Sequence, residues 1–114
     1  MSTVFAKIIA GDIPAEFLHE DEHCVVIRDI QPQAPVHLLV IPRKPIAQLA
    51  EAESADQALL GHLLLVARQM AHAHGIGDAF RTVINSGAGV GQTVFHLHVH
   101  VLGGYRAAED SLNS

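Results

Sequence analysis

Runs of apolar residues divide the chain into short segments of helix and strand character. Residues 3–10 predict a short helix, because Ser2 or Thr3 can cap its start and Gly11 stands at its end. Five later segments predict strands, since they are short, rich in β-branched or alternating apolar residues, and bounded by turn-forming residues. These strands are expected over residues 16–20, 23–29, 36–41, 80–85 and 95–102.

One long helix is predicted over residues 54–74. Ser54 and Gln57 have the spacing of a capping box, and Gly75 can supply a left-handed cap at the other end. Four apolar residues recur at steps of four, three and four, which places them on one face of a helix. They are Leu59, Leu63, Val66 and Met70.

The order of these segments predicts an α+β fold. Most connections between strands are too short for parallel crossovers, so the five-stranded sheet is expected to be antiparallel. A chain of 114 residues has room for one core. We therefore expect a single domain over residues 1–104, followed by a polar and loose tail over residues 105–114.

Composition narrows the partners that this chain can have. The net charge is −5, and the seven Lys and Arg residues are scattered, so we expect no binding to extended nucleic acid. No apolar run approaches 18 residues, and we expect neither a membrane partner nor a secretory signal. The single cysteine, Cys24, suggests a reducing compartment and a cytoplasmic location, and we interpret it as a buried strand residue.

Three of the nine histidines stand in a row near the end of the chain. His96, His98 and His100 alternate with apolar residues, and in a strand this period of two sends all three to one side. Neighbours would then stand ~6.6 Å apart. Because like charges on one face disfavour protonation, at least one ring should be neutral near pH 7 and free to attack an electrophile.

Two other interpretations of the row remain open. In the first, the histidines only cover the exposed face of a half-buried strand. Alternatively, two of them could bind a metal together with further ligands such as His37 and Asp29, although zinc sites often use cysteine pairs that this chain lacks. Catalysis without a metal or other cofactor fits the row better, because three alternating histidines have no packing purpose.

A glycine-rich segment, residues 85–93, leads directly into the histidine row. The N–H groups around Gly87, Gly89 and Gly91 could form an anion cradle, together with Asn85 and the Thr93 hydroxyl. A flexible connection between two strands would explain the three glycines equally well.

These residues resemble the signature of the histidine-triad (HIT) nucleotide-binding proteins, and more narrowly the Hint branch of nucleoside phosphoramidases. The resemblance covers roughly residues 3–104 and rests on several motifs besides the triad. Residues 5–9 and 13–14 resemble the amino-terminal helix, 28–37 the ribose-side segment, 60–62 the long helix, and 91–95 the phosphate loop. It implies a homodimer whose two sheets join into ten strands.

The resemblance also implies a substrate and a role for each matching residue. The substrate would be a purine nucleoside monophosphate, AMP or GMP, joined through phosphorus to an amine or an acyl group. His98 matches the nucleophile, which forms a nucleotidyl-histidine intermediate, and His100 matches the residue on the α-phosphate. His96 and His37 match the supporting histidines. The remaining matches are Asp29 for the ribose, Phe5, Ile8, Ile27 and Ile30 for the base, and Asn85, Gly91, Gln92 and Thr93 for the phosphate side.

The chain departs from the family pattern in two places. Some bacterial relatives carry a zinc-binding cysteine pair near the start, where this chain has none, so we expect no structural zinc there. The tail after Gly104 does not match the branch closely. Two rival functions also fit the sequence: a nucleotide-binding module without turnover, and a dinucleoside polyphosphate hydrolase or nucleotidyl transferase.

Overall fold

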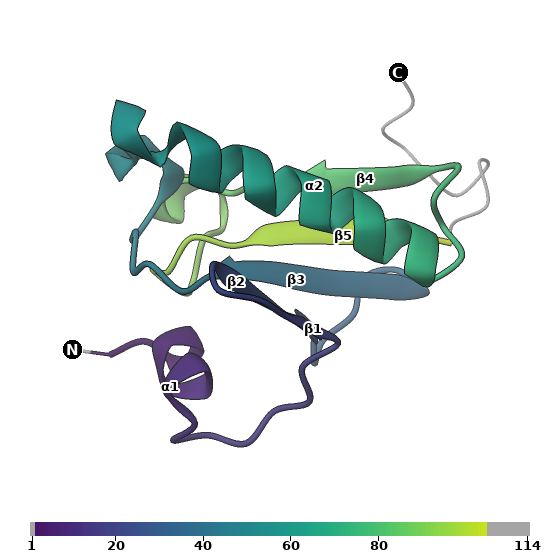
Figure 1. Ribbon diagram of the computed structural model, residues 1–114, viewed down its shortest axis with the longest axis horizontal. Helices are drawn as coiled ribbons and strands as arrows, with labels where there is room; N and C mark the ends of the chain where they lie inside the picture. The colour runs from purple at the N-terminus through teal and green to yellow at the C-terminus, as the bar shows by residue number, and fades with distance from the viewer. Residues whose placement is uncertain (1, 105–114) are drawn as a thin grey trace.

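The computed structural model describes residues 2–104 and confirms the α+β fold. Its five strands form one sheet in the order β1-β2-β3-β5-β4, and every neighbouring pair is antiparallel (Figure 1). The strands are β1 (His19–Glu20), β2 (Cys24–Arg28), β3 (Val36–Pro42), β4 (Phe80–Val83) and β5 (Val99–Gly103). The predicted loose tail lies outside the described residues.

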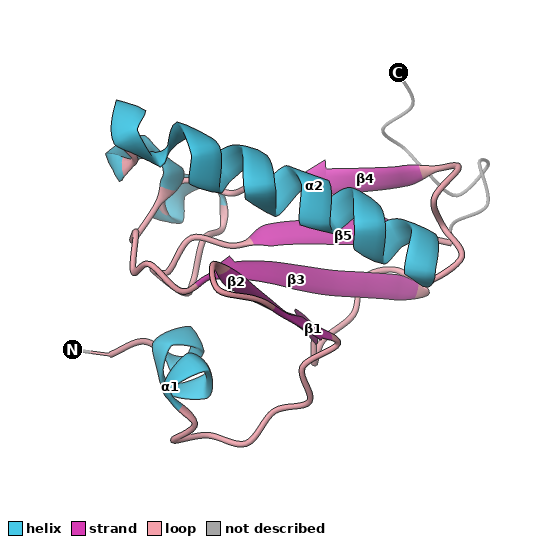
Figure 2. Cartoon of the chain, in the orientation of Figure 1, coloured by secondary structure: helices cyan, strands magenta, loops and turns pink. Residues whose placement is uncertain are grey.

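Two α-helices cover opposite faces of this sheet (Figure 2). The long helix α2 (Gln57–Ala73) lies across one face, and the short helix α1 (Val4–Ala10) lies on the other side. Three 3₁₀ turns, Leu49–Glu51, Ser54–Asp56 and Ala88–Val90, complete the regular elements. Neither helix combines the length and apolar character needed to cross a membrane.

The predicted cap of α1 is confirmed, whereas the capping box predicted for α2 is not. The Thr3 hydroxyl accepts a hydrogen bond from the Ala6 N–H at 3.1 Å, so Thr3 rather than Ser2 caps α1. The capping box expected at Ser54 and Gln57 is wrong. The Asp56 carboxylate instead accepts from the Glu53 N–H at 2.9 Å, and α2 therefore begins later than predicted.

The apolar pattern predicts the core more accurately than it predicts strand ends. Leu63, Val66 and Met70 of the predicted helix stripe are buried, and alternate residues of β2 face α2 or α1. Four strands are shorter than expected. β1 starts at His19, β2 spans only Cys24–Arg28, β4 ends at Val83, and β5 starts at Val99 rather than at residue 95.

The late start of β5 has a visible cause. The Leu97 N–H donates to the Ile46 carbonyl at 2.7 Å, and the His96 ring reaches the Pro42 carbonyl at 2.7 Å. The segment before Val99 is therefore held by the end of β3 and by the chain that follows it. The prediction that residues 95–98 belong to the strand is wrong.

Candidate active site

The histidine row lies on the α1 side of the sheet, although only His100 belongs to β5. His100 pairs with Leu39 across the β3–β5 ladder, and Leu39 packs with α1. Leu97, Val99 and Val101 face the core under α2, as the period of two predicts. Phe95 is the exception, since 41% of its surface is exposed.

The ring of His98 is fixed in one tautomer. Its Nδ1 lies 2.8 Å from the His96 carbonyl, to which it donates, so the lone pair of the neutral ring is on Nε2. The Phe5 ring meets it edge to face at 4.9 Å between centroids. His98 is partly buried. It therefore has the orientation and the free nitrogen that a nucleophile needs.

His100 is fixed by a relay of hydrogen bonds that begins in the loop before β3. The Gln33 N–H donates to His37 Nδ1 at 3.0 Å, so the proton of the neutral His37 ring is on Nε2. That nitrogen donates to His100 Nδ1 at 2.9 Å. His100 consequently keeps its own proton on Nε2, where it can donate to a bound anion.

The environment of the row favours neutral imidazoles. Burial lowers the pKa of His96 and of His98 below the ordinary value of 6.5. Burial, with repulsion from His98 and His37, lowers the pKa of His100 to about 4. The rings of His98 and His100 are 5.0 Å apart between centroids, so protonating both would bring two charges together.

His96 is held away from solvent, and its ring is 1% exposed. Its Nε2 donates to the Pro42 carbonyl, while its Nδ1 has no hydrogen-bond partner among residues 2–104. The ring thus anchors the backbone whose carbonyl orients His98.

Asp29 follows the last residue of β2 and approaches the relay. Its Oδ1 accepts from the Gln31 N–H at 2.8 Å, so Asp29 also starts the turn that follows β2. Its Oδ2 lies 3.3 Å from His37 Nε2. Asp29, His37 and His100 can present three ligand atoms within 4.8 Å of one another, so they meet the geometric minimum for a metal site.

Three of the four residues expected to contact the base gather beside the row. Phe5 and Ile8 of α1 pack with Ile27 of β2 in one apolar cluster. Ile30 is not part of this cluster and is 94% exposed, since it follows the end of β2 in the turn before β3. Residues of α1 and β2 therefore form an apolar wall next to His98.

The glycine-rich loop is held in place by the side chain of Gln92, which the resemblance matched to the phosphate side. Gln92 is buried; its amide oxygen accepts from the Gly87 N–H at 2.8 Å, and its nitrogen donates to the Ala47 and Val94 carbonyls. Gly91 has a φ of 97°, which favours glycine. Thr93 and Gly91 are exposed, and Asn85 is partly buried.

Sequence reasoning did not single out another polar group around Asp21. His19 and His62 both contact its carboxylate at 2.8 Å, and Cys24 lies beside it. His19, Asp21 and Cys24 are close in the sequence, in and between the strands predicted over residues 16–20 and 23–29. The contribution of His62, which is 41 residues away from Asp21, was not visible in the sequence.

Comparison with known proteins agrees with this geometry. The family model described as "HIT domain" matches residues 10–107. An uncharacterised HIT-like protein of Synechocystis sp. is 60% identical, over 90% of both chains. A HIT family hydrolase from Legionella pneumophila is similar in structure, with a TM-score of 0.89, 42% identity, and 92% and 95% of the chains covered. A histidine triad protein from Clostridium difficile has a TM-score of 0.87 at 34% identity, over 93% of each chain.

Proposed function

We propose, since the chain belongs to the HIT domain family, that it is a nucleotide hydrolase and, more narrowly, a purine nucleoside phosphoramidase of the Hint branch. The observation that carries the proposal is the fixed tautomer of His98, whose Nε2 lone pair is available beside a proton donor on His100. The name of the similar hydrolase from Legionella pneumophila supports hydrolysis as the reaction class.

The reaction proceeds by two displacements at phosphorus. The Nε2 lone pair of His98 attacks the α-phosphorus and forms a P–N bond. The bond from phosphorus to the substrate amine breaks, and the departing nitrogen keeps the electron pair and takes up a proton from solvent. Water then attacks the adduct, the His98–phosphorus bond breaks, and the nucleoside monophosphate leaves.

The remaining residues bind the substrate and stabilise charge. The His100 Nε2–H donates to a phosphoryl oxygen, and the Thr93 hydroxyl and loop N–H groups contact the same phosphate. Phe5, Ile8 and Ile27 form the wall for the purine. Asp29 binds the ribose hydroxyls, and Ile30, whose side chain is exposed, contributes a further apolar contact to the base.

Trapping of the adduct tests the nucleophile. Rapid quench of the enzyme with labelled AMP-N-alkylamide should show an acid-labile protein–nucleotide adduct that is absent from His98→Ala. His74→Ala is a matched control, because that histidine follows α2 as its C-cap and its ring donates to the Met70 carbonyl. An adduct that persists in His98→Ala would remove the assignment.

Two rival functions have distinct outcomes. Calorimetric binding of AMP without hydrolysis of an AMP–amine substrate would identify a binding module. Faster turnover of diadenosine polyphosphates than of AMP-N-alkylamides would identify a dinucleoside polyphosphate hydrolase. We expect AMP-N-alkylamides to be the better substrates.

A metal ion could be held by Asp29, His37 and His100. Removal of metal ions therefore tests whether the reaction needs one. We expect prolonged EDTA treatment to leave the hydrolysis rate unchanged, because each of these atoms has a role in the relay without an ion. A large loss of rate that zinc restores would replace the metal-free mechanism.

We further propose that the protein acts as a cytoplasmic homodimer and binds no nucleic acid. β4 lies at one edge of the sheet, where a second copy can extend it to ten strands. Leu64 and Leu65 of α2 are 48% and 57% exposed, and they offer apolar area for the same contact.

A further inference from the structure

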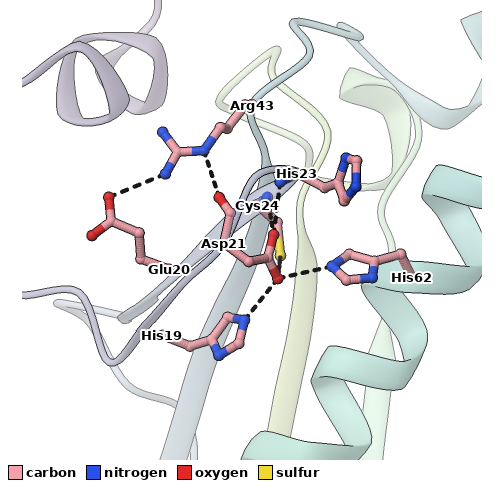
Figure 3. Close-up of polar contacts among 7 residues, drawn as sticks. All are labelled: His19, Glu20, Asp21, His23, Cys24, Arg43 and His62. Atoms are coloured by element: carbon pink, nitrogen blue, oxygen red, sulfur yellow. Dashed lines mark hydrogen bonds and ion pairs between the residues drawn. The ribbon is translucent and has the colours of Figure 1, made fainter.

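A second group of polar side chains converges where the β1–β2 turn meets α2, away from the histidine row (Figure 3). The Nε2 atoms of His19 and His62 each lie 2.8 Å from Asp21 Oδ2. Cys24 Sγ lies 3.5 Å from the same oxygen. Potential ligand atoms from two strands and a helix therefore approach one carboxylate oxygen in the turn between β1 and β2.

The spacing of these atoms suits a small cation. Ligand atoms of His19, Asp21 and Cys24 all lie within 4.8 Å of one another. Bonds of about 2.0–2.3 Å to tetrahedral zinc place neighbouring ligands roughly 3.3–3.6 Å apart. A cation would thus need to spread the two histidine–carboxylate contacts by about half an ångström and could leave the sulfur–oxygen separation unchanged.

The carboxylate of Asp21 is held so that one oxygen faces the group. Its Oδ1 accepts from the His23 N–H at 2.7 Å and from the Cys24 N–H at 2.9 Å. Arg43 fixes the turn by donating from Nε to the Asp21 carbonyl at 2.8 Å. Supporting hydrogen bonds of this kind orient the ligands of protein metal sites.

The charges of the proposed ligands match a divalent ion. A bound ion displaces the Cys24 thiol proton, and the Asp21 carboxylate and the Cys24 thiolate together balance its two positive charges.

We propose that His19, Asp21 and Cys24 bind a zinc-like divalent cation. His62 contacts Asp21 but is not part of this group of three, and its ring moves closer to become the fourth ligand. Nitrogen, sulfur and carboxylate oxygen together form a donor set that zinc prefers over magnesium or calcium. On binding, the Cys24 proton passes to the buffer, and each histidine carries its proton on Nδ1 instead of Nε2. The ion joins the β1–β2 turn to α2 and leaves His98 untouched.

Cobalt titration of the full chain tests the proposal. Co²⁺ added to the EDTA-treated protein at pH 7.5 should give the strong visible bands of tetrahedral coordination and a near-ultraviolet thiolate charge-transfer band, at one equivalent. Zn²⁺ should displace the cobalt and raise Tm, because it binds the folded state. The affinity should fall at pH 6, since protons compete for the ligands.

Variants locate the ion. Cys24→Ser should abolish the charge-transfer band, and His62→Ala, at a partly exposed position that tolerates truncation, should weaken cobalt binding at least about tenfold. Circular dichroism checks that both variants fold. His72→Ala, an exposed histidine on the same helix, should change nothing.

Two results would overturn the proposal. One is the absence of a tetrahedral cobalt spectrum in the folded wild-type protein. The other is a spectrum that survives Cys24→Ser and His62→Ala but disappears in Asp29→Asn, which would move the ion to the group formed with His37 and His100. The first result would leave the adduct test of His98 unaffected, whereas the second would place an ion beside the relay and is distinguished by the EDTA test of hydrolysis.

Discussion

At the residue scale, the chemistry of the site depends on which nitrogen of each imidazole carries the proton. Gln33 fixes His37, His37 fixes His100, and the His96 carbonyl fixes His98. The outcome is one ring that can attack and one that can donate. Both rings must be neutral to act in this way, so the rate of the reaction should depend on pH.

We expect kcat/KM to keep its neutral-pH value below pH 6.5 and to fall only at lower pH. Burial lowers the pKa of His98 from 6.5, so the ring stays neutral and nucleophilic as the pH passes through the ordinary value. The pH–rate profile for an AMP-N-alkylamide measures this. An acid limb at or above pH 6.5 would mean that His98 is not the group that must be neutral.

Stability should change over the same range. A histidine with a lowered folded pKa binds fewer protons than it does in the unfolded chain, so stability is present above pH 6.5 and is lost as the pH falls. For His100 the loss extends from 6.5 to about 4. Urea denaturation should show a decline of at most about 1.4 kcal/mol per pH unit from this group. His100→Phe should flatten the decline, and an equal slope in that variant would contradict it.

At the element scale, the glycine-rich loop is ordered by a buried side chain rather than by its glycines. Gln92 bonds at once to Gly87, Ala47 and Val94, which connects the start of the loop to its end and to the chain after β3. Glycines alone would leave many loop conformations of similar energy. The Gln92 side chain therefore determines where the phosphate-side N–H groups of the loop point.

Replacement of Gln92 by Ala should harm both stability and substrate binding. Three backbone groups lose their partner, which we expect to cost about 2–3 kcal/mol in the free energy of unfolding. KM should rise more than kcat falls, because the loop positions the phosphate and His98 is unchanged. Gln57→Ala, at an exposed glutamine in the first turn of α2, is the matched control. Equal effects of the two substitutions would argue against a role of Gln92 in ordering the loop.

At the whole-molecule scale, the candidate active site and the larger hydrophobic core lie on opposite faces of the sheet. The α1 face carries the histidine row and its apolar wall, and the α2 face carries the larger core. The outer side of α2 still exposes Leu64 and Leu65, and β4 remains at an edge. These features are the physical basis for the proposed homodimer.

Replacement of Leu65 by Glu should convert the dimer to a monomer. A buried carboxylate without a partner is costly at an apolar contact, so the dissociation constant should rise at least about a hundredfold. Analytical ultracentrifugation measures it. Leu49→Glu, at an exposed leucine of a 3₁₀ turn, should leave the dimer intact. A wild-type monomer at high protein concentration would contradict the proposal.

The sequence by itself determined the elements, the fold class and the shared side of His96, His98 and His100. It could do so because periods of two and of 3.6 residues follow directly from strand and helix geometry. The ends of strands were less predictable. β5 starts late because Leu97 and His96 bond to Ile46 and Pro42, which are distant in sequence.

Only the tertiary structure decided the protonation pattern and the second group of ligands. The tautomer of an imidazole depends on what each nitrogen faces, and those partners come from other elements, as His37 does for His100. In the same way, His62 reaches Asp21 only because α2 packs over the β1–β2 turn. Contacts between residues far apart in the chain leave no period or spacing in the sequence.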